Sequence, residues 1–270
     1  MQKIVKKLPL VFLLAFAVPM AAHAHRIWLL PSAATFDDKG ASVTLDASSA
    51  EDAFDLGTAQ PLEALVIIGP DGKPVQPEKL YGGKQRSSAD LNLKQEGTYR
   101  ASVVRESVFA SYKLNGETKR WRGDEKDMAK AIPAEAQDVQ VTRMQSRQET
   151  FMTAGKPNAA ALKRMSGVGI ELEPLTSPTG LFVGDTSRFR VLVDGKPLAN
   201  YLLGIVPGGV RYRGVLNEIA VHTDANGEFS IKWPAGGVYL LGINWPARVA
   251  GAPPAARRLG YSATFEVLPE

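Results

Sequence analysis

The sequence predicts an all-β protein made of two β-sandwiches that follow a cleaved signal peptide. Short runs of β-branched residues alternate with turn residues, and 25 Gly and 18 Pro punctuate the 270-residue chain. The periodicity of long helices is absent, and one short helix is predicted over residues 124–131, before Pro133. Similar segments recur in the same order in two halves. This order predicts one sandwich at 25–160 and a second at 166–270.

The repeated segments are hairpins and strands that open with Gly-x-Tyr. Residues 65–68 and 189–193 are β-branched runs that each lead into an Asp-Gly turn signal. Gly97 and Gly237 each precede a further strand, two residues before a tyrosine. The loop-like segment 153–167 separates the two series, so it is the predicted boundary between the sandwiches.

Two local hairpins are also predicted. The pair Asn115-Gly116 is the favoured type I′ turn, flanked by residues of high strand propensity. A second hairpin is predicted around residues 224–227, between strands at 218–223 and 228–233.

The first 24 residues have the pattern of a secretory signal. Three lysines precede an apolar stretch at residues 8–18, and the segment 22–24, Ala-His-Ala, fits the cleavage rule. Eleven residues are too few to span about 30 Å of hydrocarbon, so we expect no transmembrane segment in the mature protein and export to a periplasm. Cleavage leaves 29 of the 32 basic residues against 28 acidic ones, so the net charge of +4 belongs mostly to the signal.

The composition and motifs exclude several classes of function. The chain has no cysteine, and therefore no disulfide, Fe–S cluster or thiol nucleophile. It lacks the G-x-S-x-G, Walker, dinucleotide and H-E-x-x-H motifs, so we expect a protein that is not an enzyme. Lys113, Lys119, Arg120 and Arg122 surround Trp121 in the first hairpin. In an exported protein this predicts a solvated charged hairpin and no nucleic-acid partner.

The processed amino terminus is the candidate metal site. Cleavage after Ala24 makes His25 the first residue, so its α-amino nitrogen and Nδ1 can chelate one ion. His222, the other histidine of that mature chain, is the candidate second ligand. Nitrogen ligands in a tetragonal arrangement suit Cu²⁺ or Ni²⁺, and amine and imidazole nitrogens also suit Co²⁺. Cleavage after Ala22 would instead expose His23-Ala24-His25, which also binds Cu²⁺ or Ni²⁺.

Two alternatives concern the remaining ligands. Carboxylates from the first half could complete a nickel or cobalt site, and the candidates are Asp46, Asp52 and Asp55. His222 could instead be an ordinary solvated residue, since strand alternation gives it a polar face shared with Glu218, Ala220 and Asp224.

Several segments resemble one bacterial family. The mature chain opens with HRIWLLP at residues 25–31, and further similar segments lie at 109–123, 169–174, 193–197, 206–213 and 223–227. Together they resemble a NikM-like periplasmic family, a domain of unknown function described as the periplasmic component of nickel/cobalt uptake systems. The resemblance implies immunoglobulin- or transthyretin-like β domains, a metal ligand at His25 and an inner-membrane metal uptake system as partner. Some relatives carry histidines in the segment matching 51–60, where this chain has none.

The leading hypothesis is thus a periplasmic protein that binds Ni²⁺, Co²⁺ or Cu²⁺ through His25. The first alternative is a structural or interaction module of the cell envelope that presents its loops to another protein or a polysaccharide. The second is an enzyme that uses a copper–histidine site for oxidative chemistry on a polymer.

Overall fold

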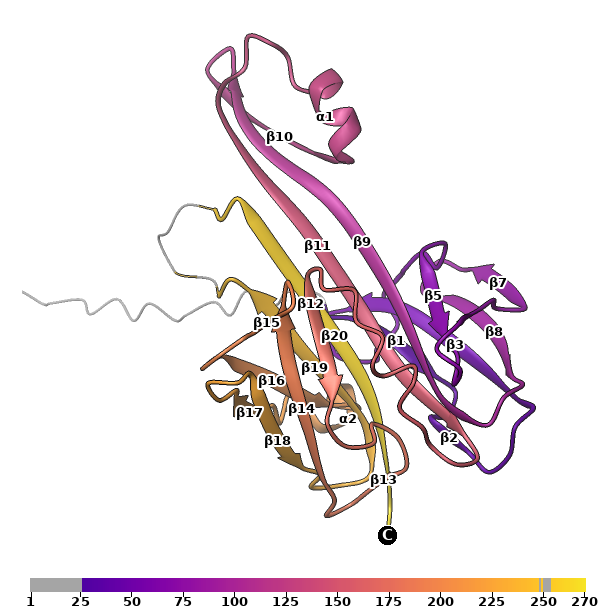
Figure 1. The fold of residues 1–270 in the computed structure, drawn as a ribbon. Helices are drawn as coiled ribbons and strands as arrows, with labels where there is room; N and C mark the ends of the chain where they lie inside the picture. The colour runs from indigo at the N-terminus through magenta and orange to yellow at the C-terminus, as the bar shows by residue number, and fades with distance from the viewer. Residues whose placement is uncertain (1–25, 248, 250–253) are drawn as a thin grey trace, which may run out of the picture.

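The computed structural model describes residues 26–247, 249 and 254–270 (Figure 1). His25 and the predicted signal at 1–24 lie outside the described residues. Within them the chain forms three β-sheets and two short helices, α1 (Glu125–Ala131) and α2 (Val210–Arg213). The prediction of an all-β sandwich protein is confirmed.

One large sheet lies between two smaller ones. The first small sheet contains β1 (Arg26–Pro31), β3 (Ala41–Ala50), β4 (Thr58–Ala59), β7 (Lys79–Gly82) and β8 (Ser87–Leu93). The second contains β12 (Ile170–Pro174), β14 (Thr186–Val193), β15 (Lys196–Pro197) and β18 (Glu228–Lys232). The central sheet contains β2 (Thr35–Phe36), β5 (Leu65–Ile68), β6 (Pro74–Val75), β9 (Gly97–Leu114), β10 (Glu117–Gly123), β11 (Gln137–Ala154), β13 (Leu181–Phe182), β16 (Leu202–Pro207), β17 (Ile219–His222), β19 (Gly237–Trp245) and β20 (Arg257–Leu268).

The two cores lie on opposite faces of the central sheet. On β11, Phe151 belongs to the core beneath the second small sheet, and Met152 belongs to the core beneath the first. Successive strand residues point to opposite faces, so one strand supplies both cores. Residues 147–154 are consequently all buried, although they do not form a continuous apolar run. The division into 25–160 and 166–270 remains a prediction. The structure adds that β11, which lies in the first range, supplies side chains to the cores of both parts.

The local predictions met different outcomes. β9 and β10 form the hairpin predicted at Asn115-Gly116, where both residues have positive φ. Helix α1 occupies the predicted helical segment. The hairpin predicted around residues 224–227 is wrong, because β17 pairs with β16 in the central sheet while β18 pairs with β14 in the second small sheet. This turn carries the chain from one sheet to the other.

The sheet-changing turn depends on Gly227, which has a φ of 74°. A Cβ at this position would lie 2.6 Å from the carbonyl oxygen of Val191. We expect Gly227→Ala to lower the free energy of unfolding by about 2–4 kcal/mol in urea denaturation. Gly116→Ala is the matched control, since Gly116 has a φ of 80° and open space around its Cβ position. It should cost about 1 kcal/mol, and equal losses would contradict the role given to the close approach.

Candidate functional site

The start of β1 is held by both halves of the chain. The Arg26 guanidinium donates a hydrogen bond to the carbonyl of Glu51 at 2.7 Å. Ser262 Oγ, on β20, donates to the carbonyl of Ile27 at 2.7 Å. Trp28 is 2% exposed and packs with residues of β16, β19 and α2. His25 is therefore covalently joined to a strand that these contacts hold in place.

Of the two predicted metal ligands, the structure describes only His222. It is the exposed last residue of β17, which forms one end of the central sheet, and it lies opposite Leu202. Because His25 lies outside the described residues, whether the two histidines meet stays a prediction. Within 26–247, 249 and 254–270, no group of three or more His, Cys, Asp or Glu side chains could hold a metal ion.

His222 lies on the face of the central sheet that β1 contacts. Paired residues share a face, so His222 and Leu202 lie on the same side as Val206, four residues farther along β16. Val206 packs in one cluster with Trp28 of β1. Ser262, which bonds to β1, is separated from β17 by β19 and β16, a lateral distance of about 14 Å at ordinary strand spacing.

Two glycines lie on the sheet face between Ser262 and β17. Gly242 and Gly204 are paired with each other in the row that joins Ser262 to β17. The space above Gly242 is open, and the carboxylate of Glu218 lies over Gly204. Glu218 therefore reaches across the sheet face, consistent with the polar face predicted around His222.

The candidate carboxylates of the first half divide into two groups. Asp46, in the middle of β3, accepts a hydrogen bond from Ser88 at 2.5 Å and pairs with Arg86 at 3.1 Å. Asp52 and Asp55 lie in the loop beside the start of β1, where the Asp55 carbonyl accepts a hydrogen bond from the Trp28 indole at 3.3 Å. Asp46 lies opposite Leu30, toward the far end of β1, whereas this loop lies beside the first residues of the strand.

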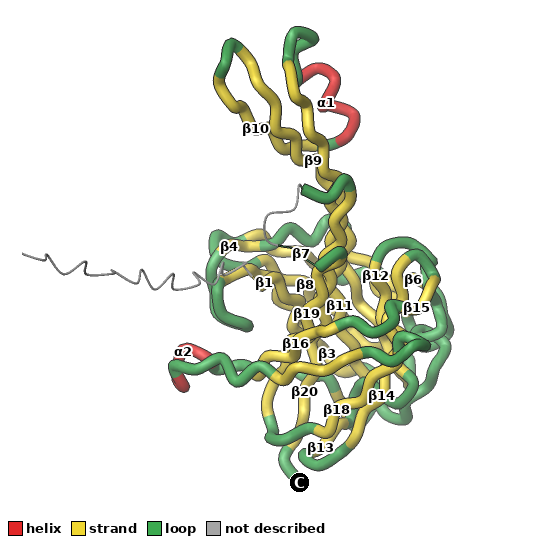
Figure 2. The backbone as a smooth tube through the Cα atoms, turned by 90° about the vertical axis from the view of Figure 1, so that its left-hand side faces the viewer, coloured by secondary structure: helices red, strands yellow, loops and turns green. Residues whose placement is uncertain are grey.

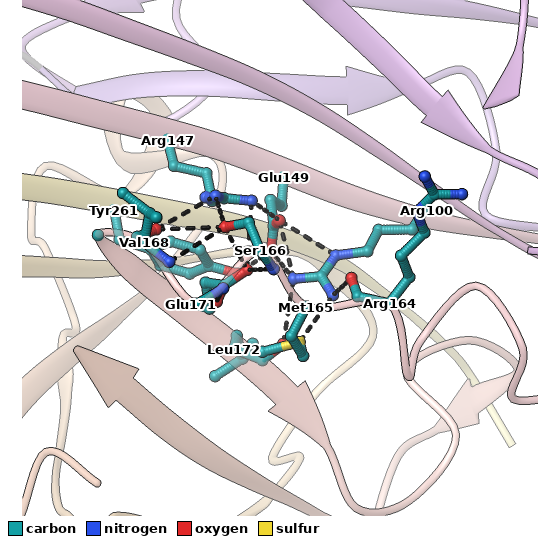
Figure 3. A network of polar contacts seen from close by, with 12 residues as sticks. Arg100, Arg147, Glu149, Arg164, Met165, Ser166, Val168, Glu171, Leu172 and Tyr261 are labelled. Atoms are coloured by element: carbon teal, nitrogen blue, oxygen red, sulfur yellow. Dashed lines mark hydrogen bonds and ion pairs between the residues drawn. The ribbon is translucent and has the colours of Figure 1, made fainter. Parts of the chain in front are cut away.

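The largest polar cluster of the described residues was missed by the sequence analysis (Figure 3). Its centre is Glu149 on β11, whose side chain is 0% exposed. Arg100 donates to both carboxylate oxygens through Nη2, at 2.9 and 2.8 Å. Tyr261 donates to Oε2 at 2.6 Å and Arg147 to Oε1 at 3.3 Å. Three neighbouring strands, β9, β11 and β20, thus contribute to one buried carboxylate site.

The same cluster fixes the predicted boundary segment. Arg100 Nη1 lies 3.4 Å from the carbonyl of Arg164, and Arg147 Nη2 donates to Ser166 Oγ at 2.9 Å. Glu171 on β12 accepts a hydrogen bond from the backbone N–H of Ser166 at 2.7 Å. The segment is loop-like as predicted, and it is tied down by side chains from both halves.

The electrostatics of the cluster stabilise the ionised carboxylate. Burial by itself raises the pKa of Glu149. The charges of Arg100 and Arg147, and the hydrogen bonds from Arg100 and Tyr261, lower it by more. The pKa of Glu149 therefore lies below its ordinary value. Burial, followed by the neighbouring Glu149 carboxylate, raises the pKa of Tyr261 well above its ordinary value. The phenol therefore remains a hydrogen-bond donor. The cluster has the properties of a structural network that orders the junction.

A weak signal for this network exists in the sequence. Arg147 and Glu149 have opposite charges two residues apart, in a segment that continues into the apolar residues of β11. Strand alternation places both on one face, but it cannot reveal that a second sandwich covers that face.

Comparison with known proteins identifies the family. The model of a domain of unknown function, DUF4198, matches residues 22–246. The chain belongs to this family. The match begins at the predicted cleavage region. It supports the resemblance to a family of unknown function, whereas the NikM-like description and nickel/cobalt transport remain predictions.

Other comparisons add little. No curated protein matches the chain. Among solved structures, a marsupial T cell receptor is 11% identical, with 91% of this chain and 74% of that chain covered and a TM-score of 0.21. This likeness is too low to carry an argument. Among the described residues, no helix is both long and apolar enough to cross a membrane.

Loss of the central carboxylate should be costly. Glu149→Gln leaves the buried Arg100 guanidinium without its counter-charge, and Arg147 keeps only Glu171, 3.7 Å away. We therefore expect the free energy of unfolding to fall by about 3–5 kcal/mol in urea denaturation. Glu125→Gln is the control, because Glu125 forms an exposed ion pair with Arg143. A loss in Glu149→Gln no larger than that in the control would contradict the central role of Glu149.

The contribution of Glu149 should also depend on pH. Because the pKa of Glu149 is lower in the folded state than in the unfolded state, its contribution is complete above the unfolded pKa, about 4.3, and is lost as pH falls through the folded value. The difference in Tm between wild type and Glu149→Gln should therefore shrink below about pH 4. A constant difference from pH 7 to pH 3 would contradict this assignment.

Proposed function

We propose that the mature protein is a non-enzymatic periplasmic protein that binds Ni²⁺, Co²⁺ or Cu²⁺ through its amino terminus at His25. Its role is to capture the ion and transfer it to an inner-membrane uptake system. The ion is cargo in this proposal. The nature of the recipient rests on the resemblance to NikM-like proteins.

The anchoring of β1 is the observation that carries the proposal. Consecutive Cα atoms are 3.8 Å apart, so a terminal amine on His25 lies within one residue of a strand held by Ser262 and Trp28. A ligand attached to rigid structure loses less conformational entropy when it binds than one at the end of a free tail.

The donor set also favours the terminus. Since the described side chains contain no group of three metal ligands, a strong site requires donors from outside them. Cleavage after Ala24 supplies an amine and an imidazole together. His222 supplies the third nitrogen in this proposal, because its side of the central sheet is the side that β1 contacts.

The alternative, an interaction module, is favoured by a different observation. The distal parts of β9 and β11, together with β10 and α1, extend away from the two sandwiches (Figure 1). Capture of a protein partner that persists in His25→Ala, together with native protein free of metal, would support this alternative over metal binding.

Metal binding can be tested with protein exported by its own signal. Intact mass under native conditions gives the cleavage site and any bound ion, and calorimetry at pH 8 gives the affinity. We expect saturable binding of at least one of the three ions at one ion per chain. We expect His25→Ala, and a variant with one extra residue before His25, to bind at least about tenfold more weakly.

The variants separate the ligands. The extra residue preserves the imidazole but moves the amine, while His222→Ala removes only the proposed third nitrogen. Binding by the extended variant as tight as wild type, or no saturable binding by correctly processed protein, would overturn the proposal. Unchanged affinity in His222→Ala, together with weaker binding in Asp55→Asn, would show that the third ligand is the Asp55 carboxylate and not the His222 imidazole.

The affinity should fall as the pH is lowered. Chelation needs a neutral amine, and α-amino groups ordinarily have a pKa of about 7.7–8.0. Below this value we expect the affinity to decrease about tenfold per pH unit for this proton alone, measured by calorimetry from pH 8.5 to pH 6. Affinity that is independent of pH over this range would contradict coordination by the amine.

A further inference from the structure

The central sheet continues into an arm that leaves the two sandwiches, here defined as residues 108–142. β5 pairs with β9 only over residues 65–68 and 100–103, and β20 pairs with β11 only from residue 143 onward. Beyond these points β9 pairs with β10 and the first part of β11. Figures 1 and 2 both show the arm standing away from the rest of the molecule.

One face of the arm is covered by its own residues. Val108 and Ala110 are 3% and 0% exposed. Trp121 pairs with Ala110 across the hairpin, and its ring lies over Gly123. Helix α1 packs beside β9 and β10. The arm therefore has a small core of its own.

The opposite face carries two arginines without a counter-charge. Arg120 pairs with Ser111 and Arg122 with Phe109, and both arginines are exposed. No carboxylate of the described residues lies within ion-pair distance of either one. By contrast, Lys113 and Lys119 in the same hairpin are paired with acidic side chains.

The outer edge of β10 is unpaired in the described residues, since this seven-residue strand pairs with β9 alone. In a hairpin with a two-residue loop, the residues flanking the loop form a hydrogen-bonded pair, and the pattern then alternates. The backbone N–H groups of Thr118, Arg120 and Arg122 are therefore directed outward. They form a template to which another strand can be added.

The charge of β10 decides what kind of strand fits. Lys119, Arg120 and Arg122 give the strand three cations against the single carboxylate of Glu117. A second copy of β10 would place like charges opposite one another, which is destabilising. An acidic strand would place carboxylates opposite the arginines, and its backbone would satisfy the outward N–H groups.

We propose that the arm binds an extended acidic segment of another envelope protein as an additional strand along β10, with Arg120 and Arg122 paired to its carboxylates. This interaction is independent of metal binding at the amino terminus. It assigns a partner surface to a part of the chain that neither sandwich requires for its core.

The probe for this proposal is a labelled, end-capped octapeptide of alternating Glu and Val, and its binding to the mature protein is measured by fluorescence anisotropy. We expect saturable binding that weakens with added salt, and no binding of the same peptide with Lys in place of Glu. The double variant Arg120→Glu/Arg122→Glu should bind about tenfold more weakly or worse. Lys156→Glu/Lys163→Glu, with the same change in net charge at exposed positions outside the arm, should stay within about twofold of wild type.

A backbone variant separates strand addition from adsorption of a polyanion. Thr118→Pro removes one outward N–H without altering charge, and it should weaken binding about tenfold, whereas Thr118→Ala should not. If Thr118→Pro does not fold, hydrogen exchange on wild type takes its place, and the peptide should protect the amides of residues 118, 120 and 122.

Four results would overturn the proposal. They are unchanged binding by a folded Thr118→Pro, absence of added protection in β10, equal losses in the two charge-reversal variants, and failure of the acidic peptide to bind. Dimerisation of the protein through β10 in sedimentation experiments would identify a second copy as the occupant instead.

Discussion

The arrangement of the two sandwiches depends on the ionised carboxylate of Glu149, which is buried where both cores meet β11. β11 is covered on both faces over residues 147–154, so a charged side chain there needs protein groups to replace its hydration. Glu149 meets that condition only because Arg100, Arg147 and Tyr261 converge on it from three neighbouring strands. A buried ion pair of this kind gives little net stability over an apolar core, but removal of one partner is costly. The cluster therefore specifies how the strands and the junction segment fit together.

Much of the fold could be predicted from the sequence because its signals are local. Turn residues such as Asn115-Gly116 require positive φ, and this requirement is visible in the residue types themselves. The turn at residues 224–227 has an equally strong signal, yet the strands on either side enter different sheets. A turn sequence fixes the direction of the chain over a few residues. The sheet that each strand joins depends on apolar partners far away in the sequence.

The candidate site shows the same limit. Residue types predict His25 and His222 as candidate ligands, but only the register of β16 and β17 reveals which face of the sheet His222 occupies. The loop containing Asp52 and Asp55 lies beside β1 because β1 pairs with β3, a long-range pairing that no local pattern specifies. The buried charges of Arg147 and Glu149 were missed for a related reason. Alternation placed them on one face, and nothing in the sequence showed that a second sandwich covers it.

The arm and β1 differ in how they are related to the central sheet: β1 packs on its face, whereas the arm extends from it and, within the described residues, has an unpaired edge. β1 is fixed by contacts with both halves, which suits a site that must hold its donors in one geometry. The arm has its own small core and an unpaired edge, which suits recognition by strand addition, because backbone hydrogen bonds tolerate variation in the partner's side chains. β9 and β11 pass from the arm directly into the network around Glu149. The two strands that lead into the arm therefore have their opposite ends buried between the two small sheets, where the network around Glu149 orders them.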